Sequence, residues 1–363
     1  MDRTRKILWT LAAAFSLIAL AAERTLTPYE RSPLYDKMTR AAGIMASAES
    51  LVRSARAEAG IAIDPVHDPN KTGMIGVEYS ETTTSMGELE AKRTTTNPDM
   101  AALAVSLLWQ AGVHEGDAIA IGASGSFPAM TLAVLSAARA LNLDVALVVS
   151  LGASTWGANM PDFSYLKMHA AARSVLGYDI LAVSLGGGRD SGGDMTEEGR
   201  AILRAEMSAS GIYVIDEKDT PSSVAKRATL YDNFFFGRHC SAFVNIGGAT
   251  ANVGEGLTVL ELAPGVNGSV PKLKDEDRGM VYEMGLKGIP VVHLLNIKKL
   301  AMDNGVPWDP VPFPQIGRSR VYRVYDRGAY RRRLILLIAA YGCSLGFLAA
   351  IYRKAAGRGG RVS

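Results

Sequence analysis

The chain reads AIAIGASGSFP from Ala118 to Pro128, an apolar run followed by a turn rich in glycine and serine. The run at 118–121 is wholly apolar, as strands are when helices bury both of their faces. Residues 129–140 favour a helix, since Pro128 can set its first turn and Ser126 can cap it. This order of strand, turn and helix predicts the first part of a βαβ unit.

The same rhythm continues toward the C-terminus. Apolar runs of strand length recur at about the spacing of βαβ units, at residues 145–151, 180–185, 212–215, 242–246 and 290–295. We therefore predict an α/β domain over residues 116–317, with a doubly wound, mostly parallel sheet and glycine-rich turns.

Residues 23–115 are predicted to form a helical and mixed N-terminal region. Small and apolar residues recur at helical spacing over residues 28–60. A candidate strand follows at 74–79, and then a threonine-rich connector. Asn97 and Pro98 are typical of the cap and the first position of a further helix.

Two apolar segments flank these regions. Ile7–Ala22 follows a basic start, and Leu334–Tyr352 carries no charge over about the length that a helix needs to cross a bilayer. We assign residues 1–22 to an N-terminal membrane anchor, with a cleaved signal peptide as the alternative. Residues 334–352 are a predicted transmembrane helix, between a basic juxtamembrane segment at 318–333 and a basic tail at 353–363.

Basic residues flank both sides of the two predicted spans, so charge alone gives a divided answer on orientation. The first segment resembles the basic and apolar regions of a signal anchor. We therefore expect a two-pass protein of the plasma membrane with both termini in the cytoplasm and the large domain outside. The opposite orientation stays open.

The net charge of +3 hides an asymmetry, because residues 23–317 carry 25 Lys and Arg against 34 Asp and Glu. A net charge of −9 in this region argues against a broad nucleic-acid interface, which needs a positive face. Cys240 and Cys343 are a poor disulfide pair, since Cys343 falls within a predicted span. The five histidines lack metal-ligand spacing, so we expect no metal site and assign no cofactor.

Four turns rich in Gly, Ser, Thr and Asn follow four of the six predicted strands, at residues 122–128, 151–157, 186–194 and 245–254. The carboxyl ends of parallel strands lie at one edge of the sheet, where backbone N–H groups can bind an anion. The candidate ligand-binding residues are Gly122, Ser124, Gly125, Ser126, Ser154, Thr155, Trp156, Gly187, Arg189, Asp190, Asn245, Gly247 and Gly248.

Each turn also has a purely structural interpretation. The first can be a tight connection that uses glycine for its geometry, and Trp156 can simply pack within the domain. Asp190 and Asp194 can hold a cation, or Asp194 or Thr196 can merely cap the following helix. The last turn lacks the lysine of a phosphate-binding loop.

Ser124, Ser126, Asp190 and Asp194 are the weak catalytic candidates. The segment from Gly122 to Ser126 does not match the G-x-S-x-G nucleophile pattern, because its second glycine comes one place early. A serine hydrolase would also need a histidine and an orienting acid. Candidates are His169, His239 and His293 with Asp162, Asp190 or Asp194, and no spacing singles one out.

Several segments together resemble the poly-gamma-glutamate system protein family. These are the apolar N-terminal segment, YSETTTSMGELEAKRTTTNPDMAAL at 79–103, the 122–128 turn, GGGRDSGGD at 186–194, NIGGATANVG at 245–254 and the closing apolar segment. The resemblance covers nearly the whole chain. It implies an accessory membrane protein that works with the machinery for making and exporting poly-γ-glutamate, a capsule polymer, with other subunits of that machinery as partners.

The sequence excludes two roles in such a pathway. It has no P-loop, which an ATP-dependent ligase would need, and no clustered Asp, His and Asn motifs of a metallophosphoesterase. Two interpretations remain open. In one, the glycine-rich edge binds a small anion or a γ-glutamyl polymer end without turnover; in the other, the edge is the active site of a γ-glutamyl hydrolase or transferase, or of an enzyme that binds a nucleotide or phosphate.

Overall fold

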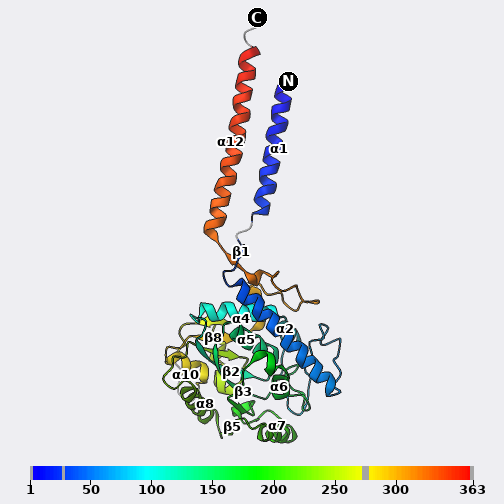
Figure 1. The fold of residues 1–363 in the computed structure, drawn as a ribbon, viewed down its shortest axis with the longest axis vertical. Coiled ribbons are helices and arrows are strands. Elements are labelled where there is room, and N and C mark those ends of the chain that lie inside the picture. Colours follow the sequence, from blue (N-terminus) through cyan, green and yellow to red (C-terminus); the bar gives the residue numbers. More distant parts are fainter. Residues whose placement is uncertain (1–2, 27–28, 272–277, 360–363) are drawn as a thin grey trace. The chain divides into compact units, whose positions relative to one another are not determined.

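The computed structural model describes residues 3–26, 29–271 and 278–359 (Figure 1). The chain divides into two units, residues 33–322 and a second unit made of residues 1–32 and 323–363. Residues 360–363 of the expected basic tail lie outside the described residues.

A seven-stranded sheet forms the centre of the larger unit, in the order β5-β4-β3-β2-β6-β8-β7. All neighbouring strands are parallel except β7, which is antiparallel to β8. The strands are β2 (Ala118–Ser124), β3 (Asp144–Ser150), β4 (Ala182–Ser184), β5 (Tyr213–Ile215), β6 (Ala242–Ile246), β7 (Gly265–Asn267) and β8 (Val291–Leu294). The predicted α/β class and the mostly parallel sheet are confirmed.

Helices cover both faces of this sheet. Alternate residues of β2 point to opposite sides, so Ile119 packs into one hydrophobic cluster and Ala120 into the other. The first cluster includes side chains from α2 (Tyr35–Glu58), α4 (Asp99–Gln110), α5 (Pro128–Ala140), α6 (Tyr165–Leu176), α7 (Glu197–Ala209) and α11 (Ile297–Asp303). The second includes side chains from α8 (Thr220–Phe235) and α10 (Met280–Leu286).

Short elements complete the larger unit. They are α3 (Leu89–Thr95), α9 (Thr250–Val253) and the 3₁₀ turns η1 (Gly188–Asp190), η2 (Leu257–Glu261) and η4 (Arg320–Tyr322). α3 lies inside the region that we expected to be a connector. β7 was also missed, because a strand of three residues that begins with a glycine carries too little pattern to be predicted.

The expected strand at 74–79 was wrong. This segment is irregular, and its backbone groups bond to a neighbouring loop instead of a sheet. Gly76 N–H donates to the Trp156 carbonyl (3.2 Å), while the Asn159 amide bonds both the N–H and the carbonyl of Val77 (3.0 and 2.8 Å). The backbone N–H and carbonyl groups of this apolar run are thus satisfied by a loop, so the run needs no place in the sheet.

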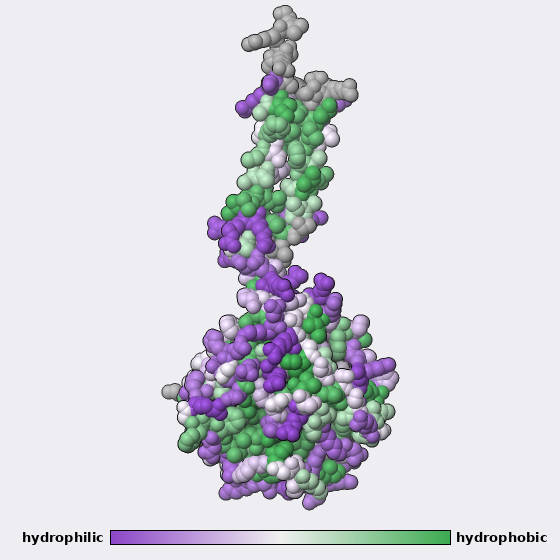
Figure 2. All heavy atoms as spheres, viewed as in Figure 1, coloured by the Kyte–Doolittle hydropathy of each residue, from purple (hydrophilic) through white to green (hydrophobic). Residues whose placement is uncertain are grey.

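The smaller unit contains two long helices, α1 (Arg3–Thr25) and α12 (Arg327–Gly359), and the antiparallel pair β1 (Tyr29–Arg31) and β9 (Arg323–Tyr325). The segments Lys6–Arg24 and Arg327–Lys354 are long and apolar enough to cross a membrane. Their exposed surfaces are mainly apolar (Figure 2). The predicted helix from residue 28 was wrong at its start, since Tyr29–Arg31 pairs with β9 and α2 begins at Tyr35.

The two long helices contact each other through polar as well as apolar groups. The Ser16 and Tyr341 hydroxyls lie 2.7 Å apart, in the middle of the apolar parts of α1 and α12. A hydroxyl pair satisfies two polar groups that have no water to bond within a bilayer. The contact therefore suits a pair of membrane helices.

Candidate functional site

The strand order changes direction between β2 and β6. From β2 the chain adds β3, β4 and β5 on one side. It then returns to place β6 on the other side of β2, with β8 next to β6 and β7 at the edge of the sheet. In open parallel sheets, ligands bind beyond the carboxyl ends of the strands at such a point. Ser124 ends β2, and Gly247 follows β6.

A cavity of about 390 Å³ lies at this edge of the sheet. Its wall is rich in Gly, Ser and Thr, with one lysine and one aspartate. The lining residues are Thr84, Ser85, Met86, Gly87, Lys92, Ser124, Ser126, Phe127, Gly152, Ser154, Gly187, Asp194, Gly248, Ala249, Thr250 and Leu295. The wall has the size and the polar groups of a site for a small ligand.

Lys92 supplies the cation of this cavity, although only 3% of its surface is exposed. Its Nζ donates to the Ser154 Oγ at 2.7 Å and to the carbonyl of Ser126. Nζ also lies 3.7 Å from the ring centroid of Phe127. Among the described residues, no carboxylate forms an ion pair with Lys92.

Burial without a carboxylate disfavours the charged form of this amine. It lowers the pKa of Lys92 to about 7, from an ordinary value of about 10.4. At neutral pH the side chain is therefore divided between the ammonium and the free amine. Buried lysines with such pKa values are found where a protein needs a base or a switchable cation.

Lys92 reaches the cavity because the segment before it runs along the second glycine-rich turn. Thr84 N–H donates to the Ala153 carbonyl (2.8 Å), and Thr155 N–H donates to the Ser85 carbonyl (2.9 Å). At Gly87, an added Cβ would lie 2.9 Å from the Ser154 Oγ and 3.0 Å from the Lys92 Cε. Glycine at this position lets the backbone approach the two side chains closely.

The serines of the first turn position Ser154. The Ser126 Oγ accepts from the Ser154 N–H at 2.9 Å, and the Ser124 Oγ accepts from the Ser126 N–H at 3.2 Å. Ser126 does not cap α5, so that expectation was wrong: Phe127 is the residue before the helix, and no side chain caps it. The Ser126 hydroxyl is used instead to join two turns.

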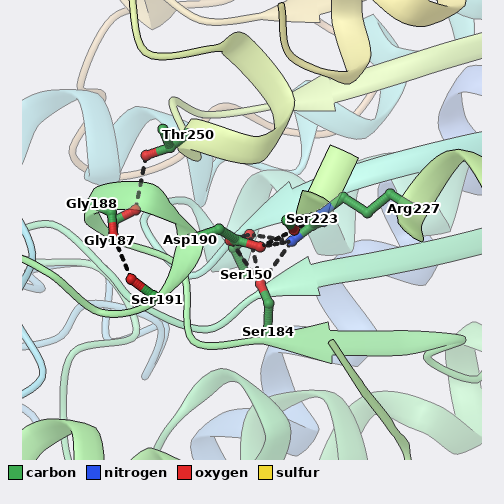
Figure 3. A network of polar contacts seen from close by, with 9 residues as sticks. All are labelled: Ser150, Ser184, Gly187, Gly188, Asp190, Ser191, Ser223, Arg227 and Thr250. Atoms are coloured by element: carbon green, nitrogen blue, oxygen red, sulfur yellow. Dashed lines mark hydrogen bonds and ion pairs between the residues drawn. The ribbon is translucent and has the colours of Figure 1, made fainter. Parts of the chain in front are cut away.

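The third turn is held by a buried ion pair between Asp190 and Arg227, whose side chains are 1% and 0% exposed. Arg227 Nη2 lies 2.8 Å from Asp190 Oδ2. The hydroxyls of Ser150, Ser184 and Ser223 donate to the same carboxylate at 2.6–3.0 Å (Figure 3). Asp190 therefore fixes the turn from inside the fold and does not line the cavity.

The two ends of this turn face the cavity, because Gly187 and Asp194 both line its wall. The Thr250 Oγ donates to the Gly187 carbonyl at 2.8 Å (Figure 3), which joins the turn to α9. Asp194 is exposed at the cavity wall. Thr196, and not Asp194, caps α7 by accepting from the Gly199 N–H at 3.0 Å.

The structure thus brings six of the sequence-predicted residues to one cavity. They are Ser124, Ser126, Ser154, Gly187, Asp194 and Gly248. The remaining candidates do not line it: Gly122, Gly125, Thr155, Trp156, Arg189, Asp190, Asn245 and Gly247.

These other candidates have structural contacts or face solvent. The Trp156 ring lies on the His67 ring with centroids 4.4 Å apart. The Asn245 amide donates to the Gly247 carbonyl and to His293 Nδ1, both at 3.0 Å. Arg189 is exposed.

No match to this chain is found among protein family models, curated proteins or solved structures. The chemistry that the cavity supports is therefore inferred from the residues that line it.

Sequence reasoning missed Lys92, the most informative residue of the cavity. Its neighbours in sequence are charged and threonine residues on a short helix, which is typical of a solvated connector. The signal that exists is the segment from Thr82 to Gly87, which is small except for Met86 and allows the backbone to lie close to another loop. That signal predicts a close approach, but not which side chain it buries.

Histidine contributes nothing to the wall of this cavity. Burial lowers the pKa of His293 to about 4, and its ring bonds Asn245. His169 lies in α6 and bonds the Tyr178 carbonyl at 3.0 Å. The described residues thus place none of the expected Ser-His-Asp combinations around the cavity.

A larger cavity, of about 1040 Å³, lies at the opposite edge of the sheet and includes Asp144 and Tyr213, the first residues of β3 and β5. Ligands of parallel sheets bind at the other ends of the strands. Among the described residues, no group of three or more His, Cys, Asp or Glu could hold a metal ion. We therefore take the cavity around Lys92 as the candidate site.

Proposed function

We propose that this chain is a two-pass membrane protein that assists the synthesis or export of poly-γ-glutamate, and that the cavity around Lys92 binds a γ-glutamyl end of the polymer. The pathway rests on the resemblance of segments 79–103, 186–194 and 245–254 to the poly-gamma-glutamate system protein family. The ligand class rests on one observation, the buried and unpaired Lys92.

A carboxylate is the ligand that such a lysine lacks. Its present partners are neutral oxygens and an aromatic ring, so desolvation of the ammonium is only partly offset. A bound carboxylate would favour the charged form and raise the pKa of Lys92. The cavity wall also offers the N–H groups of Gly248 and Ala249, which have no acceptor among the described residues.

The charge of the domain favours recognition of an end over recognition of a long chain. Residues 23–317 carry a net charge of −9, which repels an extended polyanion. Within the cavity, by contrast, the described residues of the wall include one cation, Lys92, and one acidic side chain, Asp194. A single γ-glutamyl carboxylate suits this distribution.

The finer points of architecture and location belong to the same proposal. We assign the domain a Rossmann-like, doubly wound arrangement with its glycine-rich turns around the ligand. We place it outside the plasma membrane of a bacterial cell, with α1 and α12 as the two spans and with other subunits of the polymer machinery as partners. The first span begins with basic residues, as a signal anchor does.

Binding of oligo-γ-glutamate to the full chain in lipid nanodiscs tests this proposal. We expect the wild-type chain to bind and the Lys92→Met variant to bind about tenfold or more weakly. Lys167→Met is the matched control, since Lys167 is exposed on α6. Affinity should fall as the pH rises above about 7, because the ammonium is lost.

Three outcomes would contradict the proposal. Equal binding by the wild type and Lys92→Met would show that Lys92 takes no part in binding the ligand. Equal binding of α-linked and γ-linked oligoglutamate would remove the proposed specificity. Binding of inorganic phosphate or a nucleotide in place of oligo-γ-glutamate would favour a phosphate ligand.

A further inference from the structure

The amine of Lys92 and the hydroxyl of Ser154 have the arrangement of a base and a nucleophile. Their heavy atoms are 2.7 Å apart, within the range for proton transfer. Both residues line the same cavity, and both are at least 95% buried. Serine and lysine form one of the known variants of serine catalysis in which no histidine is needed.

We propose that Ser154 is a nucleophile activated by Lys92, so that the cavity cleaves or transfers γ-glutamyl amide bonds. This inference rests on the proposed function for its substrate. It differs from the assignment of Ser124 or Ser126 with an aspartate, because those serines have no comparable base.

Three features support Ser154 over its neighbours. Lys92 Nζ bonds the hydroxyl of Ser154, whereas at Ser126 it bonds only the backbone carbonyl. The Ser126 Oγ accepts from the Ser154 N–H, so Ser126 is a positioning residue. The Ser124 Oγ accepts from the Ser126 N–H and has no lysine partner.

The lysine also has a suitable protonation state. A base must be unprotonated at the working pH, and burial lowers the pKa of Lys92 to about 7. Apart from Lys92 itself, Asp194 is the titratable side chain among the described residues of the wall, and Glu90 and Arg93 flank Lys92 on α3. Burial is the cause of the shift. Because a carboxylate beside Lys92 would restore the ammonium, Lys92 acts as a base only when the amide group of the substrate, and not a carboxylate, faces its amine.

The reaction balances with water or an amine as the second substrate. Ser154 Oγ attacks the amide carbon while Lys92 Nζ takes its proton. The C–N bond then breaks, and the proton passes from Lys92 to the leaving nitrogen, which leaves an acyl ester on Ser154. Water or a second amine attacks this ester, Lys92 takes the incoming proton, and the C–O bond breaks as Ser154 regains a proton.

Labelling with an alkyl fluorophosphonate tests the dyad directly. The Ser154 Oγ would form a bond to phosphorus, fluoride would leave, and the proton would pass to Lys92. We expect one adduct on the full chain in nanodiscs, mapped to Ser154 by mass spectrometry of its peptides. The rate should rise with pH along a curve with a midpoint near 7.

Variants separate the two roles. Ser154→Ala should give no adduct, and Lys92→Met should react about 10²–10⁴-fold more slowly, which is the usual range for loss of a general base. Ser208→Ala on the exposed face of α7 and Lys167→Met on α6 are matched controls that should react like the wild type. Release of free amino groups from oligo-γ-glutamate should follow the same order.

The same preparations distinguish failure of the dyad from failure of the proposed function. Oligo-γ-glutamate binding by Ser154→Ala, without label or turnover in the wild type, would overturn the dyad and keep the binding function. An adduct on Ser154 without binding of oligo-γ-glutamate would support Ser154 as a nucleophile activated by Lys92, and it would contradict oligo-γ-glutamate as the substrate. An adduct on Ser124 or Ser126 would also overturn the assignment of Ser154.

Discussion

Lys92 Nζ lies 2.7 Å from Ser154 Oγ, although 62 residues separate them in the sequence. The pairing depends on two turns that run side by side, residues 80–87 and 151–157. Because a lysine so placed loses its water but gains no carboxylate, its chemistry differs from that of a solvated lysine. This contact gives rise to the first predictions.

The stability of the domain should depend on pH through Lys92. In the unfolded chain this lysine titrates near its ordinary pKa of about 10.4, and in the folded chain at about 7. Between these values the unfolded state binds more protons, so the free energy of unfolding rises with pH. Relative to Lys92→Met, the wild type should gain about 1.4 kcal/mol for each pH unit between 7 and 9.5.

Denaturation of the full chain in detergent, followed by tryptophan fluorescence, measures this difference. The difference in the free energy of unfolding between the wild type and Lys92→Met should stop changing below about pH 6, where Lys92 is protonated in both the folded and the unfolded state. Equal pH dependence in the wild type and Lys92→Met would mean that Lys92 keeps an ordinary pKa in the folded protein.

Gly87→Ala should damage the site more than the fold. The added Cβ would lie 2.9 Å from the Ser154 Oγ and 3.0 Å from the Lys92 Cε, so at least one of the two must move. We expect fluorophosphonate labelling to slow by about tenfold or more, since catalysis is sensitive to shifts of this size. The melting temperature should change little. Gly268→Ala is a control for the same substitution at a position with open space that does not line the cavity.

The Asp190–Arg227 pair should be one of the most sensitive points of the fold. Asp190→Ala leaves the Arg227 guanidinium buried without its carboxylate, at a cost of about 3–5 kcal/mol in the free energy of unfolding. Adding Arg227→Met should recover part of this loss, because the uncompensated charge is removed. Urea denaturation of the wild type, Asp190→Ala and the double variant Asp190→Ala/Arg227→Met measures the loss and its partial recovery.

An exposed pair provides the control for this prediction. Arg173 and Asp179 also form an ion pair, but both side chains are mostly exposed. Asp179→Ala should leave stability nearly unchanged, since exposed pairs contribute little. A loss for Asp190→Ala as small as that for Asp179→Ala would contradict a structural role for the buried pair.

The proposed orientation predicts which residues a membrane-impermeant maleimide can reach in intact cells. Glu198→Cys on the exposed face of α7 should react before lysis. Arg353→Cys, directly after the apolar run at 334–352, should react only after lysis. The native cysteines give little background. Burial raises the pKa of Cys240 to about 11, and Cys343 lies within the apolar part of α12. The reverse order of labelling would place the domain in the cytoplasm.

The sequence alone predicted most of the sheet, and the reason is visible in particular strands. The run at 242–246 coincides with β6, the run at 118–121 lies in β2, and the run at 145–151 overlaps β3 except for its last residue. These strands are buried on both faces, so their composition identifies them without neighbours. The two long apolar helices were equally plain, because length and the absence of charge identify them.

The candidate site could be predicted only in part. Glycine-rich turns after parallel strands predict a common edge, and this brought Ser124, Ser126, Ser154 and Gly187 into consideration together. Whether a turn residue faces the cavity or the interior depends on its partners. Asp190 turns inward because Arg227, on a helix far along the chain, lies there to meet it.

What the sequence determined by itself is therefore the local pattern: apolar strands, small residues in the turns between strands and helices, and two long apolar segments within helices. Only the tertiary structure decided the state of Lys92. Burial lowers its pKa, and the turns that contain Phe127 and Ser154 lie directly against its amine. The chemistry of an ionisable group depends on the water and charges around it, and these are set by contacts between distant segments.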